Sequence, residues 1–535
     1  MKKIFSKPAL TSATAFIIYL MILNFVLHMV TGWQYGLFFD ESYYYSMSNH
    51  LDFGYVDVAP ITAWLMALSR LLLGDTVQAM HVFPALAGCF IMLFAALTAR
   101  KMGGGRFAQS VTALAVMMAP LFMAVASMFT YDVFDQLMAA AAIYVAACLL
   151  SGGDKPKTWV LFGFVLGIGL MVKITMGFLI LALFVGLLLT PARKYLKSKW
   201  LWIAAAIAIG CVVPYIIWQA VHGFPIAEYL QGYRQHRTIM PSPTQLFLNI
   251  AVTMNILTVV LWLGGLIMLF TKRGRAFRPF AWAFLAYFVL ASVIYVKFYA
   301  LAGVMIPITA FGAVCLERNF RADSLPMQIA DGIEPEPVKK KGKLSIALKA
   351  VFLTLLCLLG IAQVPLTVPF LTPKETIAYA RYVDVTGFVK FDSTNGFSSM
   401  LAGRLGWDEM TKLVSDTYHS LPEQEQKECK IFCLHYFEAG GIDYYSKKYD
   451  IPSPISGHLS FYYWGDDGYD GGPIILVGMQ HTLTSQMMEL FDEVEVVKGP
   501  HTNYALYYIN DVPIYVCNGL KISPEEFWQL ARRVD

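Results

Sequence analysis

The sequence predicts a polytopic α-helical membrane protein with a small α/β domain at its C-terminal end. Hydrophobic residues fill 57% of the 535 positions and charged residues only 15%, whereas soluble proteins carry about 25% charged residues. Apolar runs long enough to cross a bilayer recur up to residue 371 and then stop. The net charge changes at the same point, from +14 over residues 1–371 to −10 over residues 372–535. We therefore expect a membrane domain, 1–371, and a separate C-terminal domain, 372–535.

Eleven apolar segments are expected to span the membrane, because each is apolar over about the length that a bilayer requires. The first segment is too long for a signal-peptide core and lacks a small-residue cleavage site, so we expect an uncleaved anchor. The fifth and sixth segments are short neighbours. The eleven segments are 10–31, 79–99, 107–126, 133–150, 158–171, 174–190, 200–219, 246–270, 279–295, 299–316 and 347–370.

The distribution of positive charge predicts the orientation in the membrane. With the N-terminus in the cytoplasm, the cytoplasmic segments hold 23 Lys and Arg, and the opposite loops and span ends hold five. Cytoplasmic loops of inner-membrane proteins are enriched in Lys and Arg. We therefore expect a first extracytoplasmic loop at 32–78, a cytoplasmic linker loop at 317–346, and a periplasmic or extracytoplasmic C-terminal domain in a multi-pass cell (inner) membrane protein.

The C-terminal domain alternates helical and strand-like patterns, which suggests a small α/β fold. Its cysteines, Cys429, Cys433 and Cys517, could form a disulfide outside the cytoplasm, although no spacing requires one. We expect helices at Trp407–Leu421, Glu438–Tyr449 and Thr484–Phe491, and strands at Ile431–Tyr436, Ile474–Gly478, Val494–Val497, Tyr504–Ile509 and Ile514–Cys517.

Ionisable residues gather on the predicted outer face of the membrane domain. Such groups are costly at membrane depth, so a function is the first expectation for them. A carboxylate can accept the proton of a hydroxyl nucleophile, while Lys and Arg can stabilise a phosphate leaving group. The group therefore suits a reaction between an anionic donor and a neutral acceptor. Its members are Asp40, Glu41, Asp52, Asp57, Asp132, Asp135, Lys173, Glu228, His236, Arg237 and Lys297.

Five sequence stretches occur in an order that resembles a known family. The first is Phe38-Phe-Asp-Glu-Ser-Tyr-Tyr-Tyr45 with His50-Leu-Asp-Phe-Gly-Tyr-Val-Asp57 and Pro60; the others are Thr130-Tyr-Asp132, Gly169-Leu-Met-Val-Lys173, Val296-Lys-Phe-Tyr299, and a C-terminal set of Glu438-Ala-Gly-Gly-Ile-Asp443, Ser456-Gly-His458 and Tyr463-Trp-Gly465. This ordered set, which covers nearly the whole chain, resembles the protein O-mannosyltransferase-like bacterial glycosyltransferases of the GT-C fold. That family includes the lipid A aminoarabinose transferases and the rhizobial lipopolysaccharide core glycosyltransferases.

The resemblance implies inverting transfer of a sugar from a polyprenyl-phosphate-linked donor to a lipid, glycan or protein acceptor on the non-cytoplasmic face. It implies that Asp40 is the catalytic general base and that Glu41 orients Asp40 or the acceptor. On the residues alone, Asp40 could instead cap a helix starting at Glu41, and Glu41 could be a first-turn carboxylate favoured by the helix dipole.

Asp57 and Asp132 are candidate substrate-binding residues. Relatives often have Asp-His-Pro-Pro where this chain has Asp57-Val-Ala-Pro60, so the histidine and any role it has in the family are missing here. Asp57 could instead shape a bend of the loop, and Asp132 could be a helix N-cap.

Four cations, Lys173, Lys297, Arg237 and His236, are candidates for binding the donor phosphate. Lys173 lies between two apolar runs at the predicted outer face, and Lys297 precedes another span. The alternative for the two lysines is ordinary snorkelling at a span end. The alternative for His236 and Arg237 is a solvated loop.

The sequence predicts no metal site and no certain cofactor. Glu438, Asp443 and His458 match no established ligand spacing, although two carboxylates near a phosphate could recruit a divalent cation. No Gly-rich phosphate loop follows a strand, which disfavours a nucleotide-sugar donor and an ATP-driven pump. The expected partners are the donor, the acceptor and membrane lipids, with no nucleic acid.

Two other functional classes stay open. A transporter or lipid flippase usually shows midplane charges and internal repeats. The charges here cluster at one face, and the two halves of the membrane domain show no convincing repeat. A non-catalytic envelope assembly protein that has kept the fold is the other alternative.

Overall fold

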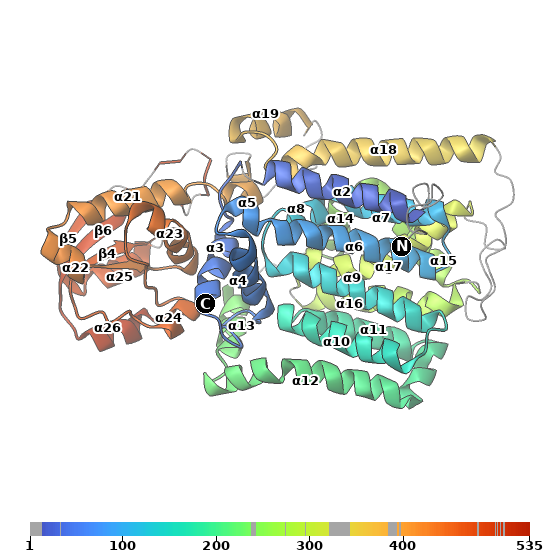
Figure 1. The fold of residues 1–535 in the computed structure, drawn as a ribbon, viewed down its shortest axis with the longest axis horizontal. Helices are drawn as coiled ribbons and strands as arrows, with labels where there is room; N and C mark the ends of the chain where they lie inside the picture. Colours follow the sequence, from blue (N-terminus) through green and yellow to red (C-terminus); the bar gives the residue numbers. More distant parts are fainter. Residues whose placement is uncertain are drawn as a thin grey trace.

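A helical bundle and a small mixed sheet make up the fold, and three short helices lie between them (Figure 1). The computed structural model describes residues 13–32, 34–236, 242–272, 274–294, 296–319, 343–383, 393–394, 397–478, 481–497, 499, 501–502, 504–506 and 509–534. Residues 372–534 contribute the sheet and the helices packed around it.

The elements of the membrane part, up to residue 367, are α-helices and short 3-10 helices, and the longest stretch without a described element, residues 318–342, separates the last two. They are α2 (Ala13–Thr31), α3 (Phe39–Asn49), α4 (Ile61–Leu73), α5 (Val77–Met80), α6 (Val82–Lys101), α7 (Arg106–Met117), α8 (Pro120–Ala126), α9 (Tyr131–Leu150), α10 (Pro156–Val172), α11 (Met176–Leu188), η1 (Pro191–Lys197), α12 (Lys199–Val221), α13 (Pro225–His236), α14 (Pro243–Thr253), η2 (Ile256–Thr258), α15 (Val259–Leu269), η3 (Arg275–Phe277), α16 (Arg278–Val293), η4 (Phe298–Leu301), α17 (Ala302–Glu317) and α18 (Lys343–Thr367).

Each of the eleven predicted segments coincides with a helix or a pair of consecutive helices. Within the described residues, seven helices are long and apolar enough to cross a membrane, and up to ten spans result if each bent pair counts as one. The remaining predicted segment corresponds to α10, which has 17 residues. The prediction of a polytopic helical membrane protein is confirmed.

The side chain of one residue, Asn255, connects two of the breaks between helices. The α7–α8 pair is bent by 64°, and the helices that flank residues 254–255 are bent by 109°. The buried Asn255 lies at the second break with φ +68°. Its amide donates to the carbonyl oxygens of Met118 (3.1 Å), at the first break, and of Leu356 (3.3 Å), in α18. Because lipid offers no hydrogen bonds, such internal donors allow a helix to break at membrane depth.

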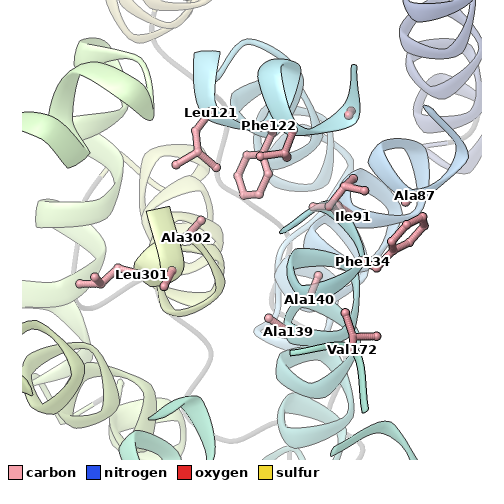
Figure 2. Packing of buried hydrophobic residues seen from close by; sticks show 14 of the residues in the cluster. Ala87, Ile91, Leu121, Phe122, Phe134, Ala139, Ala140, Val172, Leu301 and Ala302 are labelled. Carbon is pink, nitrogen blue, oxygen red and sulfur yellow. The ribbon is translucent and has the colours of Figure 1, made fainter. Parts of the chain in front are cut away.

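The helix α17 lies in the middle of the bundle and is buried along almost its whole length. Its small residues allow close packing: a Cβ on Gly303 would lie 2.7 Å from the Cβ of Ala139 in α9, and one on Gly312 would lie 1.9 Å from the Leu261 carbonyl oxygen in α15. Small residues take this role in many membrane bundles. Figure 2 shows the same alanine-rich packing, with Ala139 and Ala302 among the buried side chains.

The carboxylate of Glu317, at the C-terminal end of α17, binds the N-terminal end of α7. It accepts hydrogen bonds from the backbone N–H groups of Gly105 (2.7 Å), Phe107 (3.1 Å) and Ala108 (3.3 Å), at the start of α7. The ammonium of Lys349 in α18 donates to the Glu317 carbonyl at 2.9 Å. Negative charge is favoured at a helix N-terminus. Glu317 therefore belongs to the bundle rather than to the linker loop predicted at 317–346; residues 320–342 of that loop lie outside the described residues.

The C-terminal region forms a four-stranded mixed sheet in the order β3-β4-β6-β5. Strands β3 and β4 are parallel, and β6 is antiparallel to both β4 and β5. The elements are α19 (Pro373–Val383), β1 (Ser393–Thr394), β2 (Phe397–Ser398), α20 (Ser399–Ala402), α21 (Trp407–Ser420), α22 (Glu423–Glu428), β3 (Lys430–Cys433), α23 (Tyr436–Tyr449), α24 (Ser460–Trp464), β4 (Ile474–Val477), α25 (His481–Met488), β5 (Phe491–Val497), β6 (Ile514–Leu520) and α26 (Pro524–Ala531).

The prediction of an α/β domain is confirmed, but one predicted strand is wrong. The described residues of Tyr504–Ile509 form turns, in which the N–H groups of Ile509 and Asn510 donate to the Leu506 carbonyl. The apolar residues that suggested a strand are buried as a loop against Gly406. The predicted helix Thr484–Phe491 begins earlier, as α25, and Phe491 opens β5 instead.

The three cysteines of this region are buried as free thiols. Burial raises the pKa of each thiol, and that of Cys429 and Cys517 rises to about 12. Cys429, Cys433 and Cys517 are therefore ordinary core residues in this fold, with no disulfide among them.

Candidate active site

Three short helices, α3, α4 and α5, lie between the bundle and the C-terminal sheet (Figure 1). The helices α3 and α4 lie within the predicted first loop, 32–78, and α5 straddles its end; α3 carries Asp40 and Glu41 in its first turn. The N-cap of α3 is Phe38. The predicted alternative that Asp40 caps this helix is therefore wrong, and its carboxylate faces other groups.

The Asp40 carboxylate lies among four groups from distant parts of the chain. Tyr436 donates its hydroxyl proton to Asp40 Oδ1 at 2.9 Å. Burial raises the pKa of Asp40 to about 6, against the opposing influence of Lys297, the Tyr436 hydrogen bond and Lys173, while Asp132 raises it further. Four of the predicted site residues are therefore close enough to act on one another's charge.

Two lysines from separate loops approach the same aromatic ring. Lys173, at the end of α10, binds Asp132 Oδ1 at 2.5 Å, and its ammonium lies 4.1 Å from the ring centroid of Tyr131 and 5.2 Å from that of Tyr299. The ammonium of Lys297 lies 5.5 Å from the Tyr299 centroid. Cation–π contacts hold ammonium groups without neutralising them. Lys297, unlike Lys173, has no carboxylate ion pair within the described residues.

The structure decides against the simpler roles considered for Asp132, a helix N-cap, and for Lys173, an ordinary lysine that snorkels at a span end. The N-cap of α9 is Thr130, so the alternative that Asp132 is an N-cap is wrong. The side chain of Lys173 is only 13% exposed. A lysine that snorkels would reach for solvent, whereas this ammonium turns inward to a carboxylate and two rings.

Asp57 lies on the same side of the site as Asp40. The Tyr43 hydroxyl donates to Asp57 Oδ1 at 3.2 Å, and the charge of Asp40 acts on it. Burial raises the pKa of Asp57 to about 7, partly offset by hydrogen bonds from its own backbone and from Tyr43. At neutral pH Asp57 can therefore both accept and donate a hydrogen bond.

Glu41 points the other way, into the protein. Its fully buried carboxylate accepts hydrogen bonds from the backbone N–H groups of Phe38 (2.7 Å) and Phe129, and pairs with His81 Nε2 at 2.8 Å. Burial alone would raise the pKa of Glu41, but His81, Arg404 and the Phe129 N–H together hold it below its ordinary value. This carboxylate is engaged by the protein on all sides.

Arg404 extends this buried network into the C-terminal region. It is 2% exposed, and its guanidinium donates to the carbonyl oxygen and hydroxyl of Ser127, at 2.9 and 2.8 Å. Burial lowers the pKa of Arg404, and the charge of Glu41 opposes that shift. Glu41, His81 and Arg404 therefore join α3, the start of α6, the loop before α9 and the C-terminal region.

The two remaining predicted phosphate ligands stay predictions. Arg237 lies outside the described residues, and His236 is described only as the last residue of α13. For metal binding, no group of three or more His, Cys, Asp or Glu among the residues that the structure describes is arranged to hold an ion. Recruitment of a divalent cation by Asp40 and its neighbours also stays a prediction.

Sequence reasoning missed three residues of this region: Tyr436, His81 and Arg404. Tyr436 was expected at the end of a strand, whereas it begins α23. Its position just after a strand was a usable signal, because residues at the carboxyl ends of strands often line sites. In the sequence, His81 and Arg404 stand among mostly apolar residues, and a polar side chain that becomes buried there needs a hydrogen-bond partner.

Residues 57–218 match the model of a family described as dolichyl-phosphate-mannose-protein mannosyltransferase. No curated protein sequence matches the chain. Among solved structures, the chain is similar to ArnT from Cupriavidus metallidurans, at 15% identity over 95% of this chain and 98% of that chain. The TM-score is 0.59 for ArnT bound to undecaprenyl phosphate and 0.56 for the apo state. The predicted resemblance and the GT-C fold are thereby confirmed.

The Glu41 network makes a testable prediction about stability. Glu41→Gln removes the charge that His81 and Arg404 face, and we expect it to lower the free energy of unfolding by about 2–4 kcal/mol. Because the pKa of Glu41 is lowered in the fold, its stabilisation is present above the unfolded pKa and is lost as the pH falls through the folded pKa. Thermal unfolding in detergent as a function of pH measures both effects.

The matched control is Glu409→Gln, which changes an exposed glutamate in the first turn of α21. Exposed substitutions of this kind change stability by less than about 0.5 kcal/mol. Equal melting temperatures for the two variants would contradict the role assigned to Glu41.

Proposed function

We propose that the protein is a membrane glycosyltransferase that moves a sugar from a polyprenyl-phosphate-linked donor to a lipid, glycan or protein acceptor of the cell envelope. The observation that carries the proposal is the juxtaposition of Asp40 with Lys297 and Lys173 at one end of the bundle. It combines a carboxylate of raised pKa with two ammonium groups, on a fold similar to that of ArnT.

In the proposed reaction, the acceptor hydroxyl attacks the anomeric carbon of the donor. The new bond joins that carbon to the acceptor oxygen, the bond between carbon and phosphate oxygen breaks, and the configuration inverts. Asp40 takes the acceptor's proton, and the polyprenyl phosphate leaves with the electron pair. A base with a pKa of about 6 is largely ionised at pH 7 and still strong enough to assist the attack.

Lys297 and Lys173 are proposed to bind the donor phosphate and to stabilise the charge that grows on it. Asp132 holds Lys173 in the absence of a competing anion, so a phosphate would share that ammonium with it. Asp57 is proposed to bind a sugar or acceptor hydroxyl. Glu41 is proposed as a positioning residue that holds α3, and through it Asp40.

The first prediction from the proposed function concerns the general base, Asp40. Asp40→Asn keeps the shape of the side chain and removes its ability to take a proton, so we expect kcat to fall at least about 100-fold with little change in donor binding. The assay uses purified protein in lipid, polyprenyl-phosphate-linked sugars, candidate acceptors, and parallel reactions with and without EDTA. The EDTA arm tests the predicted divalent cation.

Asp408→Asn is the matched control, because Asp408 is also the second residue of its helix and also accepts a tyrosine hydroxyl at 2.9 Å, from Tyr449. It should retain full activity. Undiminished transfer by Asp40→Asn would overturn the assignment of the base. Absence of transfer with every donor, together with substrate flux into vesicles, would instead favour a transporter.

The second prediction concerns the donor phosphate. Lys173→Met keeps the aliphatic stem and removes the charge, so we expect the donor KM to rise about 10–100-fold while the acceptor KM is unchanged. Lys194→Met is the control: Lys194 also lies over a tyrosine ring, at 5.1 Å from the Tyr195 centroid, but in η1. Equal donor affinity for the two variants would contradict the phosphate role of Lys173.

The third prediction concerns the side of the membrane. The excess of Lys and Arg in one set of loops supports a cytoplasmic N-terminus and a periplasmic or extracytoplasmic C-terminal domain. A periplasm-active reporter fused after Phe370 should be active, and the same reporter fused after Lys101, at the end of α6, should be silent. The reverse pattern, with a cytoplasmic reporter active after Phe370, would overturn this orientation and the side proposed for the reaction.

A further inference from the structure

The C-terminal region contributes one side chain directly to the candidate base. The Tyr436 hydroxyl donates to Asp40 Oδ1 at 2.9 Å across 396 positions of the chain. Among the described residues, no other hydrogen bond to the Asp40 carboxylate is present. Tyr436 therefore fixes one carboxylate oxygen, and the other, Oδ2, remains for the hydroxyl of an acceptor.

Tyr436 is held from several sides. Its backbone N–H donates to His458 Nδ1 at 3.1 Å. Its ring centroid lies 4.8 Å from that of Tyr43 and 5.4 Å from that of His458. A phenol held at both its backbone and its ring has few orientations, so the hydrogen bond to Asp40 has a defined direction.

The helix that carries Tyr436 also packs closely on the helix that carries Asp40 (Figure 1). One turn after Tyr436, a Cβ on Gly440 would lie 2.8 Å from the backbone of Ser42, a contact that only glycine allows. Farther along, the Ser46 hydroxyl donates to Asp443 Oδ2 at 2.7 Å. The α23 and α3 helices are thus fixed to each other over the two turns that follow the Tyr436–Asp40 contact.

We infer that Tyr436 is a positioning residue for the general base, so that the C-terminal domain completes the active site rather than only covering it. This inference rests on the proposed function. The hydroxyl orients the Asp40 carboxylate, stabilises its ionised form by a hydrogen bond, and directs Oδ2 towards the acceptor. Without the hydroxyl, Asp40 is less well oriented and holds its proton to a higher pH.

Other charged and titratable groups also act on Asp40 and stay in place when the Tyr436 hydroxyl is removed. They are Lys297 before η4, Lys173 at the end of α10, Asp132 and Tyr131 in α9, Asp57 in the loop before α4, and Tyr44 in α3. Tyr436 itself is contacted by His458 and is influenced by Tyr229 of α13. Because Asp40 and Asp57 are coupled, the test compares profiles of wild type and variant rather than absolute values.

The experiment measures kcat for sugar transfer against pH for the wild-type protein, Tyr436→Phe and Tyr449→Phe. Tyr449 also donates a hydroxyl to an aspartate at 2.9 Å, in the same domain but away from the site. For Tyr436→Phe we expect the acid limb of the profile to move up by about half to one pH unit, the plateau to fall at least about fivefold, and the donor KM to stay within twofold. Tyr449→Phe should follow the wild-type profile.

A second variant tests the same hydrogen bond by strengthening it instead of removing it. Incorporation of 3-fluorotyrosine at position 436 supplies a more acidic phenol and hence a stronger donor, so the acid limb should move to lower pH while the fold is retained. An unchanged profile in both variants, or a uniform loss of activity with a lower melting temperature and no shift of the limb, would overturn the inference. Wild-type protein without transfer would instead be a failure of the proposed function.

Discussion

A buried carboxylate, that of Glu41, is the group around which the region between the bundle and the sheet is built. Removing such a charge from water is costly, and the protein offsets that cost with His81, two backbone N–H groups and the charge of Arg404. These partners come from the N-cap of α3, the N-cap of α6, the loop before α9 and the C-terminal region. The helix α3 can therefore bury its first turn in one orientation only, and this orientation decides where the neighbouring Asp40 points. Adjacent positions on a helix diverge by about 100°, so one carboxylate serves the structure while the next faces the site.

The bundle supplies the other half of the site because its helices end or break at defined places. Lys173 lies at the end of α10, Asp132 in the first turn of α9, and Lys297 just before α17. Helix ends are where charged side chains and free backbone groups meet the membrane surface. The close packing of α17 against α9 through Gly303 keeps two of these ends side by side. A charge cluster at the end of a close-packed bundle is thus a consequence of the same small residues that stabilise the bundle.

The sequence was most informative where one physical rule dominates. Bilayer thickness predicted the helical segments, and the cost of ionisable groups near lipid predicted Asp40, Asp132, Lys173 and Lys297, which the structure brings together. The local sequence pattern was least informative where tertiary contacts determine the secondary structure or the partner of a side chain. Residues 504–509 form a continuous apolar and aromatic run that suggested a strand, yet its described residues form turns, and Ala505 and Ile509 lie against Gly406. The position of Tyr436 after a strand could have marked it as a site residue, but no local pattern links it to Asp40, 396 positions earlier.

The contact between Tyr436 and Asp40 gives the C-terminal domain a reason to be rigidly attached. A domain that only shielded the site would need no tight attachment. The close approach of Gly440 to Ser42 instead holds α23 firmly against α3. The domain is tied down at several places, among them α23 against α3, Arg404 against Ser127, and Arg532 against Glu228 of α13 at 2.7 Å. The first of these places lies beside Asp40, the proposed base, and the second shares the network that orients α3. The third reaches α13. A domain fixed in this way can set the direction of the Asp40 carboxylate, the proposed base.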